Sequence, residues 1–159
     1  MNLRVRTRSI FVMIAWAACA CTLAESVWAE DHGCKEAKGN LSVVNNGDGT
    51  TNGTITKGGK LDGPTHAVFT STLTPTPDPT TLSYTGDFSA TNKRGALKTH
   101  NVGLFDVGTG LFSEIARIDA SASTGKFAGA TGVLYINGKT IDGGATFQAD
   151  ITGQICFAN

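Results

Sequence analysis

The chain has 159 residues, with 13 Lys or Arg against 13 Asp or Glu, so its formal net charge is zero. This balance gives no electrostatic reason to expect a nucleic-acid partner, and a polar turn between strands explains the one local basic cluster, Lys93, Arg94 and Lys98. The length fits one domain with a single hydrophobic core.

The first 29 residues have the pattern of an export signal. They open with three arginines, Arg4, Arg6 and Arg8. The apolar run that follows, Ile10–Ala20, is shorter than the roughly 20 residues that a membrane-spanning helix needs. We expect cleavage after the small residue Ala29, with a weaker site after Ala24. The sequence therefore predicts one domain over residues 30–159, exported to the periplasm or the cell exterior and without a transmembrane span.

Acylation of Cys19 or Cys21, at the end of the apolar run, is the alternative, and it would make the protein an anchored lipoprotein. Neither cysteine has a leucine three residues before it, which disfavours this alternative. Cleavage after Ala29 leaves only Cys34 and Cys156, and two cysteines in an oxidising compartment predict a disulfide. No Cys-x-x-Cys spacing indicates a metal or redox site.

The domain alternates apolar and polar side chains with a period of two, which is typical of half-buried strands. Turn sequences rich in Gly, Asn, Asp and Pro separate the alternating segments. We place strands at residues 40–45, 51–57, 65–74, 80–92, 96–106, 111–121, 131–137 and 144–157. About eight strands joined by short turns predict an all-β, antiparallel, up-and-down closed barrel, with a β-sandwich as the alternative. Pairing of Cys34 with Cys156 favours the barrel, because it brings the first and last strands together.

A glycine-rich stretch, ASTGKFAGATG at residues 122–132, raises the question of a phosphate loop. No helix pattern follows it, and its lysine precedes the later glycines, so it lacks the order that a phosphate loop needs. We expect a turn in which Gly125 takes a positive φ and Phe127 points into the core.

Histidines and acidic residues give no predicted metal site. His32, His66 and His100 are far apart in the chain, and we expect them to be polar surface residues. The sequence predicts no metal and no cofactor.

Three segments, GLFDVGTGLFSEIARI, STGKFAGATGVLYINGK and DGGATFQADITGQICF, resemble a group of exported bacterial proteins of uncertain function. Their glycine and phenylalanine strings are also similar to the eight-stranded, calycin-like barrel of allene oxide cyclase and plant dirigent proteins. The resemblance covers Tyr84–Phe157 and carries over no catalytic or substrate-positioning residue. The matching positions are mostly turn and packing residues: Gly103, Phe105, Asp106, Gly110, Phe112, Gly125, Phe127, Gly129, Gly132 and Gly153.

Aromatic residues are expected to line the lumen of this barrel. The candidate ligand-binding residues are Tyr84, Phe88, Phe105, Phe112, Tyr135 and Phe147, with Phe69 and Phe127 as further lumen aromatics. Glu114 shares the inward face of its strand with Phe112 and Ala116. If it faces the lumen, burial would raise its pKa and make it a candidate acid or base. The sequence favours the structural reading, a bulge or a position at the barrel mouth.

Three functions follow from these residues. The first, which we favour, is a non-catalytic exported barrel that binds a small hydrophobic molecule. The second is a cyclase- or dirigent-like enzyme or stereochemical guide that acts on a hydrophobic substrate without a cofactor. The third is a self-associating envelope module, a homo-oligomer joined through an apolar outer face.

Overall fold

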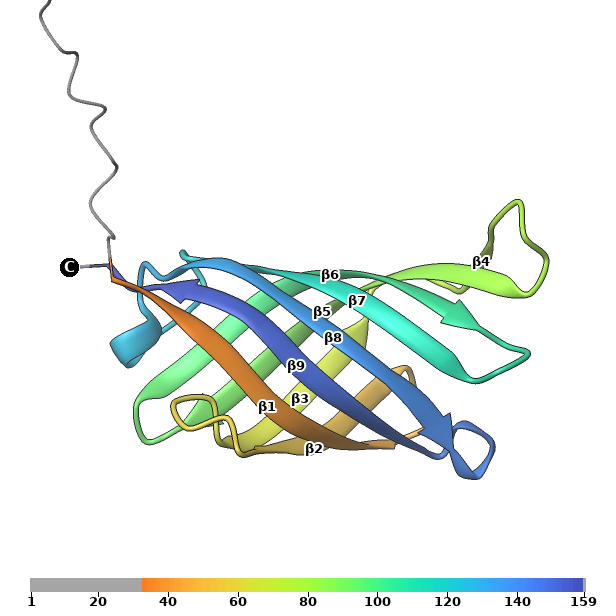
Figure 1. Cartoon of the computed structure of the whole chain (residues 1–159), viewed down its shortest axis with the longest axis horizontal. Helices are drawn as coiled ribbons and strands as arrows, with labels where there is room; N and C mark the ends of the chain where they lie inside the picture. Colours follow the sequence, from red (N-terminus) through yellow and green to blue (C-terminus); the bar gives the residue numbers. More distant parts are fainter. Residues whose placement is uncertain (1–32, 159) are drawn as a thin grey trace, which may run out of the picture.

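The computed structural model describes residues 33–158, and the alternating segments of the sequence form a single antiparallel sheet in it (Figure 1). The strands are β1 (Cys34–Asn45), β2 (Thr50–Thr56), β3 (Gly63–Phe69), β4 (Thr74–Pro75), β5 (Thr81–Asn92), β6 (Gly95–Asp106), β7 (Leu111–Ile118), β8 (Thr131–Ile141) and β9 (Thr146–Cys156). Two short 3₁₀ turns, η1 (Gly125–Phe127) and η2 (Asp142–Gly144), complete the elements. The proposed signal segment, with Cys19 and Cys21, and also His32 lie outside the described residues.

The sheet closes on itself. β1 pairs with β2 on one side and with β9 on the other, and β3 pairs with β5. Consecutive strands pair in between, so eight strands form an up-and-down barrel. The short β4 lies outside this ring and pairs with the start of β5. The predicted closed barrel is confirmed. Closure satisfies the backbone groups that an open sheet would leave unpaired at its edges.

The predicted disulfide is also confirmed. Cys34 begins β1 and stands directly opposite Cys156 at the end of β9, and the two are bonded across a separation of 122 residues. The bond therefore joins the first and last strands at one end of the barrel.

Several strand boundaries differ from the predicted ones. β1 begins at Cys34 rather than residue 40, because small inward residues such as Ala37 continue the pairing with β9 without a strong apolar signal. β3 ends at Phe69, and the chain then leaves the barrel to form β4. The predicted end of the strand at residue 137 is wrong: β8 continues to Ile141, and Asn137 and Gly138 are paired with Asp150 and Ala149.

The two ends of the lumen are filled differently. We call the end that carries the disulfide the closed end, and the opposite end, with turns 46–49, 107–110 and 142–145, the open end. Branched aliphatic side chains pack the lumen toward the closed end. These buried residues are Ile55, Leu61, Leu97, Ile118, Leu134 and Ile155, joined by Phe127.

The loop between β7 and β8 seals the closed end. Its backbone bonds to the β5–β6 turn, where the N–H of Lys126 donates to the Arg94 carbonyl at 2.7 Å. Gly125 has φ of 63°, and a side chain there would collide with Arg94, so the predicted positive φ is confirmed. Phe127 is 1% exposed and fills the lumen at the closed end. No helix among residues 33–158 is long and apolar enough to cross a membrane.

Candidate ligand-binding site

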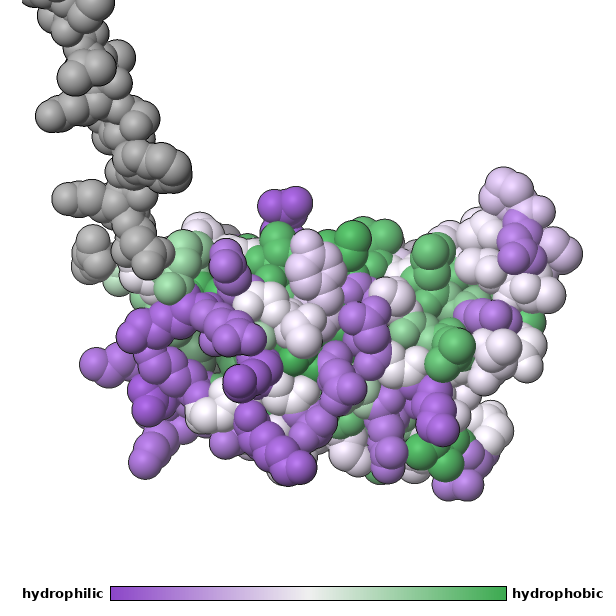
Figure 2. Space-filling view, in the orientation of Figure 1, coloured by the Kyte–Doolittle hydropathy of each residue, from purple (hydrophilic) through white to green (hydrophobic). Residues whose placement is uncertain are grey.

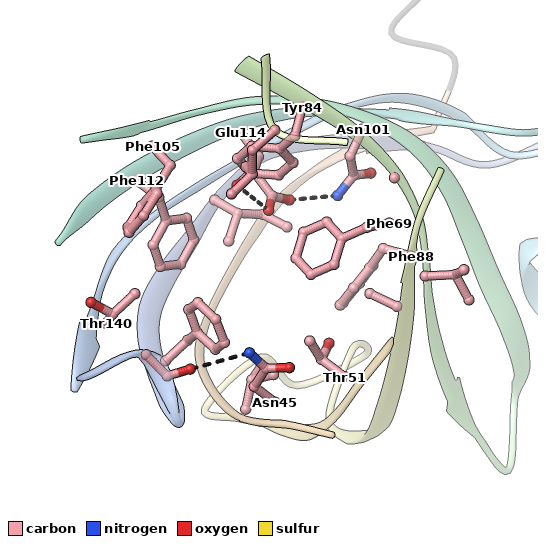
Figure 3. A pocket seen from close by; sticks show the side chains of 18 of the residues that line it. Asn45, Thr51, Phe69, Tyr84, Phe88, Asn101, Phe105, Phe112, Glu114 and Thr140 are labelled. Atoms are coloured by element: carbon pink, nitrogen blue, oxygen red, sulfur yellow. Dashed lines mark hydrogen bonds between the residues drawn. The ribbon is translucent and has the colours of Figure 1, made fainter. Parts of the chain in front are cut away.

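A cavity of about 410 Å³ occupies the lumen near the open end (Figure 3). This volume lies within the range of small-molecule sites, about 300 to 1,000 Å³. Apolar side chains of β1, β3 and β8, including Leu41, Val43 and Ile136, form the wall behind the rings. Six aromatic residues line the cavity: Phe69, Tyr84, Phe88, Phe105, Phe112 and Phe147.

Aromatic pairs hold opposite parts of this wall. The rings of Phe69 and Tyr84 meet edge to face with centroids 5.4 Å apart, and those of Phe112 and Phe147 do so at 5.8 Å. Such contacts contribute beyond the area that they bury. Phe69 is still 37% exposed, so part of its ring faces the entrance.

Tyr135 does not line the lumen, in contrast to the prediction. Its neighbours in β8, Leu134 and Ile136, are 1% exposed and point inward, so Tyr135 points outward and is 47% exposed. On the outer face it stands opposite Ile115, which in turn stands opposite Val102. This row of exposed apolar side chains crosses β6, β7 and β8. Hydrophobic side chains are visible along the upper side of the molecule in Figure 2, where Figure 1 places β6 and β7.

Glu114 faces the lumen from β7, and a glycine on β6 lets the Tyr84 side chain reach it. Gly103 of β6 stands between Tyr84 of β5 and Glu114 of β7 in the sheet register. A side chain at Gly103 would collide with the Tyr84 ring. The ring therefore lies over the middle strand, and its hydroxyl reaches the carboxylate two strands away.

Two donors hold the Glu114 carboxylate. The Tyr84 hydroxyl donates to Oε1 at 2.7 Å, and Asn101 Nδ2 donates to Oε2 at 2.6 Å (Figure 3). The Thr99 hydroxyl in turn donates to Asn101 Oδ1 at 2.6 Å, which fixes the amide with its nitrogen toward the glutamate. The polar network therefore presents one oriented carboxylate inside a mostly apolar cavity.

Burial controls the protonation of this network. Desolvation raises the pKa of Glu114 above its ordinary value, against the hydrogen bonds from Tyr84 and Asn101, which lower it. Burial, reinforced by the neighbouring Glu114 charge, raises the pKa of Tyr84 as well, so the phenol stays protonated and remains a donor. Glu114 therefore faces the lumen, the condition under which the sequence made it a candidate acid or base, and its pKa is raised there. β7 is regularly paired with β6 and β8 at this residue, without the bulge that was one part of the favoured reading.

Sequence reasoning missed Thr99 and Asn101, and it named Gly103 only among the turn and packing residues. All three lie on the inward face of β6, and Thr99 and Asn101 are 2% and 5% exposed. The alternation that places Leu97 and Phe105 inward also places these residues inward. The signal was present, but polar residues within an inward series are easily taken for surface positions.

The histidines lie away from the cavity. His66 bonds to Asn52 on the outer face, and the exposed ring of His100 bonds to Asp87 and to Asp119. Within the part of the chain that the structure describes, no group of three or more His, Cys, Asp or Glu side chains is placed to hold a metal ion.

No protein-family model matches the chain, and no curated protein sequence matches it.

Proposed function

We propose that the protein is an exported barrel that binds a small hydrophobic molecule in the open end of its lumen. The observation that carries this proposal is the cavity of about 410 Å³ with its six aromatic rings, which remains in a lumen packed at the other end. The disulfide is compatible with an oxidising, exported environment.

The cavity is apolar enough to favour such a ligand. Burial of apolar surface stabilises a complex by about 25 cal/mol per Å², and rigid rings lose little entropy when a ligand contacts them. Polar groups are few and are gathered at Glu114 and at the rim, where Asn45 Nδ2 donates to the Gly144 carbonyl at 3.3 Å. A mostly apolar pocket with a few oriented polar groups is the usual form of a small-molecule site.

Calorimetric titration with a neutral apolar probe, 4-phenylbutan-1-ol, tests the proposal. We expect saturable binding to the wild type and its loss in Ala67→Phe, because Ala67 lines the cavity and the added ring fills it. Ala128→Phe is the matched control, since Ala128 is exposed at the closed end. Absence of binding to the folded wild type, or equal binding to Ala67→Phe, would contradict lumen binding.

A second candidate function, a cyclase- or dirigent-like activity without a cofactor, is favoured by the Tyr84–Glu114 pair. A carboxyl group with a raised pKa beside a phenol, inside an apolar pocket, has the properties of a general acid or base. Turnover of a hydrophobic substrate by the wild type and loss of turnover in Glu114→Gln would support it. Binding of the same substrate without any product would contradict it.

Self-association is the third candidate, and it rests on the outer row of Val102, Ile115 and Tyr135. Sedimentation over a range of concentrations tests it. A monomeric mass throughout would remove the candidate, and a mass that falls in Ile115→Lys would support it.

A further inference from the structure

We propose that the hydrophobic molecule taken up in the lumen is an amine, bound as its ammonium ion with Glu114 as the counter-ion. This inference rests on the proposed lumen binding and adds the chemical class of the ligand.

Among the residues that the structure describes, Glu114 is the one carboxylate that points into the cavity. Asp87 also borders the cavity, but its side chain turns to the outer face and bonds to His100 at 2.7 Å. No Lys, Arg or His is among the cavity-lining residues of the described chain. The carboxylate therefore has no protein cation beside it in the lumen, and an ionised carboxylate in an apolar setting is unfavourable until a cation joins it.

The carboxylate is oriented to accept more hydrogen bonds. Each oxygen accepts one bond, from Tyr84 or from Asn101, whereas a carboxylate can accept about four. Both present donors come from β5 and β6, along the wall of the barrel. An ammonium group carries only donors and no acceptor, so it complements the remaining lone pairs directly.

Aromatic rings surround the same position. Tyr84 contacts the carboxylate, and Phe69 packs against Tyr84. A cation within about 6 Å of a ring centroid is attracted by the negative face of the ring. Rings together with one carboxylate favour a protonated amine with a hydrocarbon body over a neutral ligand, which gains only the apolar part.

Charged residues at the open end also favour a cationic ligand. Each open-end connection or its border carries an aspartate: Asp48, Asp78, Asp106 and Asp142. No Lys or Arg lies in the described open-end turns 46–49, 107–110 and 142–145 or in segment 70–80, which contains β4. The nearby Lys139 is exposed on the outer wall of β8.

The closed end carries the opposite charge. Its cations, Lys35, Lys57, Lys60, Lys93, Arg94 and Lys126, outnumber its carboxylates, Glu36, Asp62 and Asp119. Hydrophilic side chains gather over this end, at the left of Figure 2. Such a field steers cations toward the open end and repels anions from it. A fatty acid or another carboxylate would meet the acidic rim first and Glu114 next, so anionic ligands are disfavoured twice.

The protonation of Glu114 makes the binding pH-dependent. The groups that face it are Tyr84 from β5, Asn101 from β6 and Ile136 from β8, and of these only Tyr84 titrates. The phenol stays protonated in the range in which a carboxyl group titrates. Ammonium binding requires the carboxylate, so amine affinity falls as the pH is lowered through the Glu114 transition, with no such fall for a neutral ligand.

A matched ligand series tests the inference on the full exported domain by isothermal titration calorimetry. The probes share one hydrocarbon body: 4-phenylbutylamine, 4-phenylbutan-1-ol and 4-phenylbutanoate. At pH 7 we expect the amine to bind about tenfold or more tightly than the alcohol, and the carboxylate to bind weakest. Glu114→Gln should bring the amine to the level of the alcohol. Glu36→Gln, which removes an exposed carboxylate at the closed end, should keep the preference.

The outcomes separate this inference from the proposed function. Binding of the alcohol with equal or weaker binding of the amine would overturn the ammonium assignment and leave lumen binding intact. Failure of all three probes would overturn both. If Glu114→Gln does not fold, the wild type still decides: amine affinity that falls between pH 7 and pH 4, with constant alcohol affinity, supports the assignment, and parallel behaviour of the two overturns it.

Discussion

The two ends of this barrel are built by the same eight strands and yet have opposite contents. Toward the closed end, aliphatic side chains such as Leu97 and Leu134 belong to one buried cluster that fills the lumen. Toward the open end, the inward positions hold aromatic rings and glycines, and a cavity remains. Closure of a sheet therefore does not decide whether its interior is a core or a site; the side chains at inward positions decide it.

The difference comes from how large and small residues are arranged around the circumference. At the open end, Tyr84 stands beside Gly103, and Phe88 stands opposite Ala67. The Tyr84 ring leans over Gly103 along the wall, as its contact with Glu114 shows, rather than across the lumen. At the closed end Phe127 enters from a loop along the barrel axis and fills the centre directly.

Removal of the disulfide at the closed end should lower the free energy of unfolding more than any other change. We expect the double variant Cys34→Ser/Cys156→Ser to lose about 4 to 5 kcal/mol of unfolding free energy, because the bond closes a very long loop. Urea denaturation of the oxidised wild type and the variant measures this loss. A difference under about 1 kcal/mol would show that strand pairing alone holds the ends together.

A ring removed from each end should have unequal effects. Phe127→Ala is expected to cost about 3 to 5 kcal/mol, since it leaves a void in packed surroundings. Phe105→Ala, at the partly exposed edge of the cavity, should cost under about 1.5 kcal/mol. Chemical denaturation of both variants checks the ratio, and equal losses would contradict the division into a packed and an open end.

The pH dependence of stability should carry the signature of Glu114. Its folded pKa is raised above the ordinary value of 4.5, so the folded state holds the proton more tightly than the unfolded state. Stability contributed by this group is therefore highest below about pH 4.5 and is lost as the pH rises through the folded pKa. Denaturation from pH 4 to pH 8 should show a steeper decline for the wild type than for Glu114→Gln.

His100 on the outer wall should give the smallest effect. Its hydrogen bond and charge interaction with Asp87, and then those with Asp119, raise the pKa of His100 above 6.5. The protonated ring therefore stabilises the fold below about pH 6.5, and this contribution is lost as the pH rises through the folded pKa. The group is exposed, so salt should screen it. His100→Gln should flatten this small pH dependence at low salt and leave ligand binding unchanged.

The closed barrel could be predicted from the sequence, because alternation and two terminal cysteines both specify it. The turn at Asp106 was also readable: its carboxylate accepts from the Gly108 N–H at 2.8 Å, as a turn cap should. The inward direction of Glu114 followed from period two. Its partners did not, since Tyr84 and Asn101 come from other strands and only the register brings them together.

Tyr135 shows where residue type is misleading and alternation is not. Aromatic identity suggested an inward residue, but the position between Leu134 and Ile136 requires an outward one. Parity along the strand is the stronger guide, because neighbouring residues cannot share a face. The cavity itself lay beyond prediction, because its volume depends on the sum of many side-chain shapes.

The absence of a side chain at Gly103 allows this single position to influence the proton affinity of Glu114. A methyl group there would push the phenol of Tyr84 aside while both the phenol and Glu114 kept their chemical identity. The proton affinity of the carboxyl would then be reset from a third strand, by geometry alone. The space that the absent Cβ leaves on the inner wall thus helps to set the acidity of the interior.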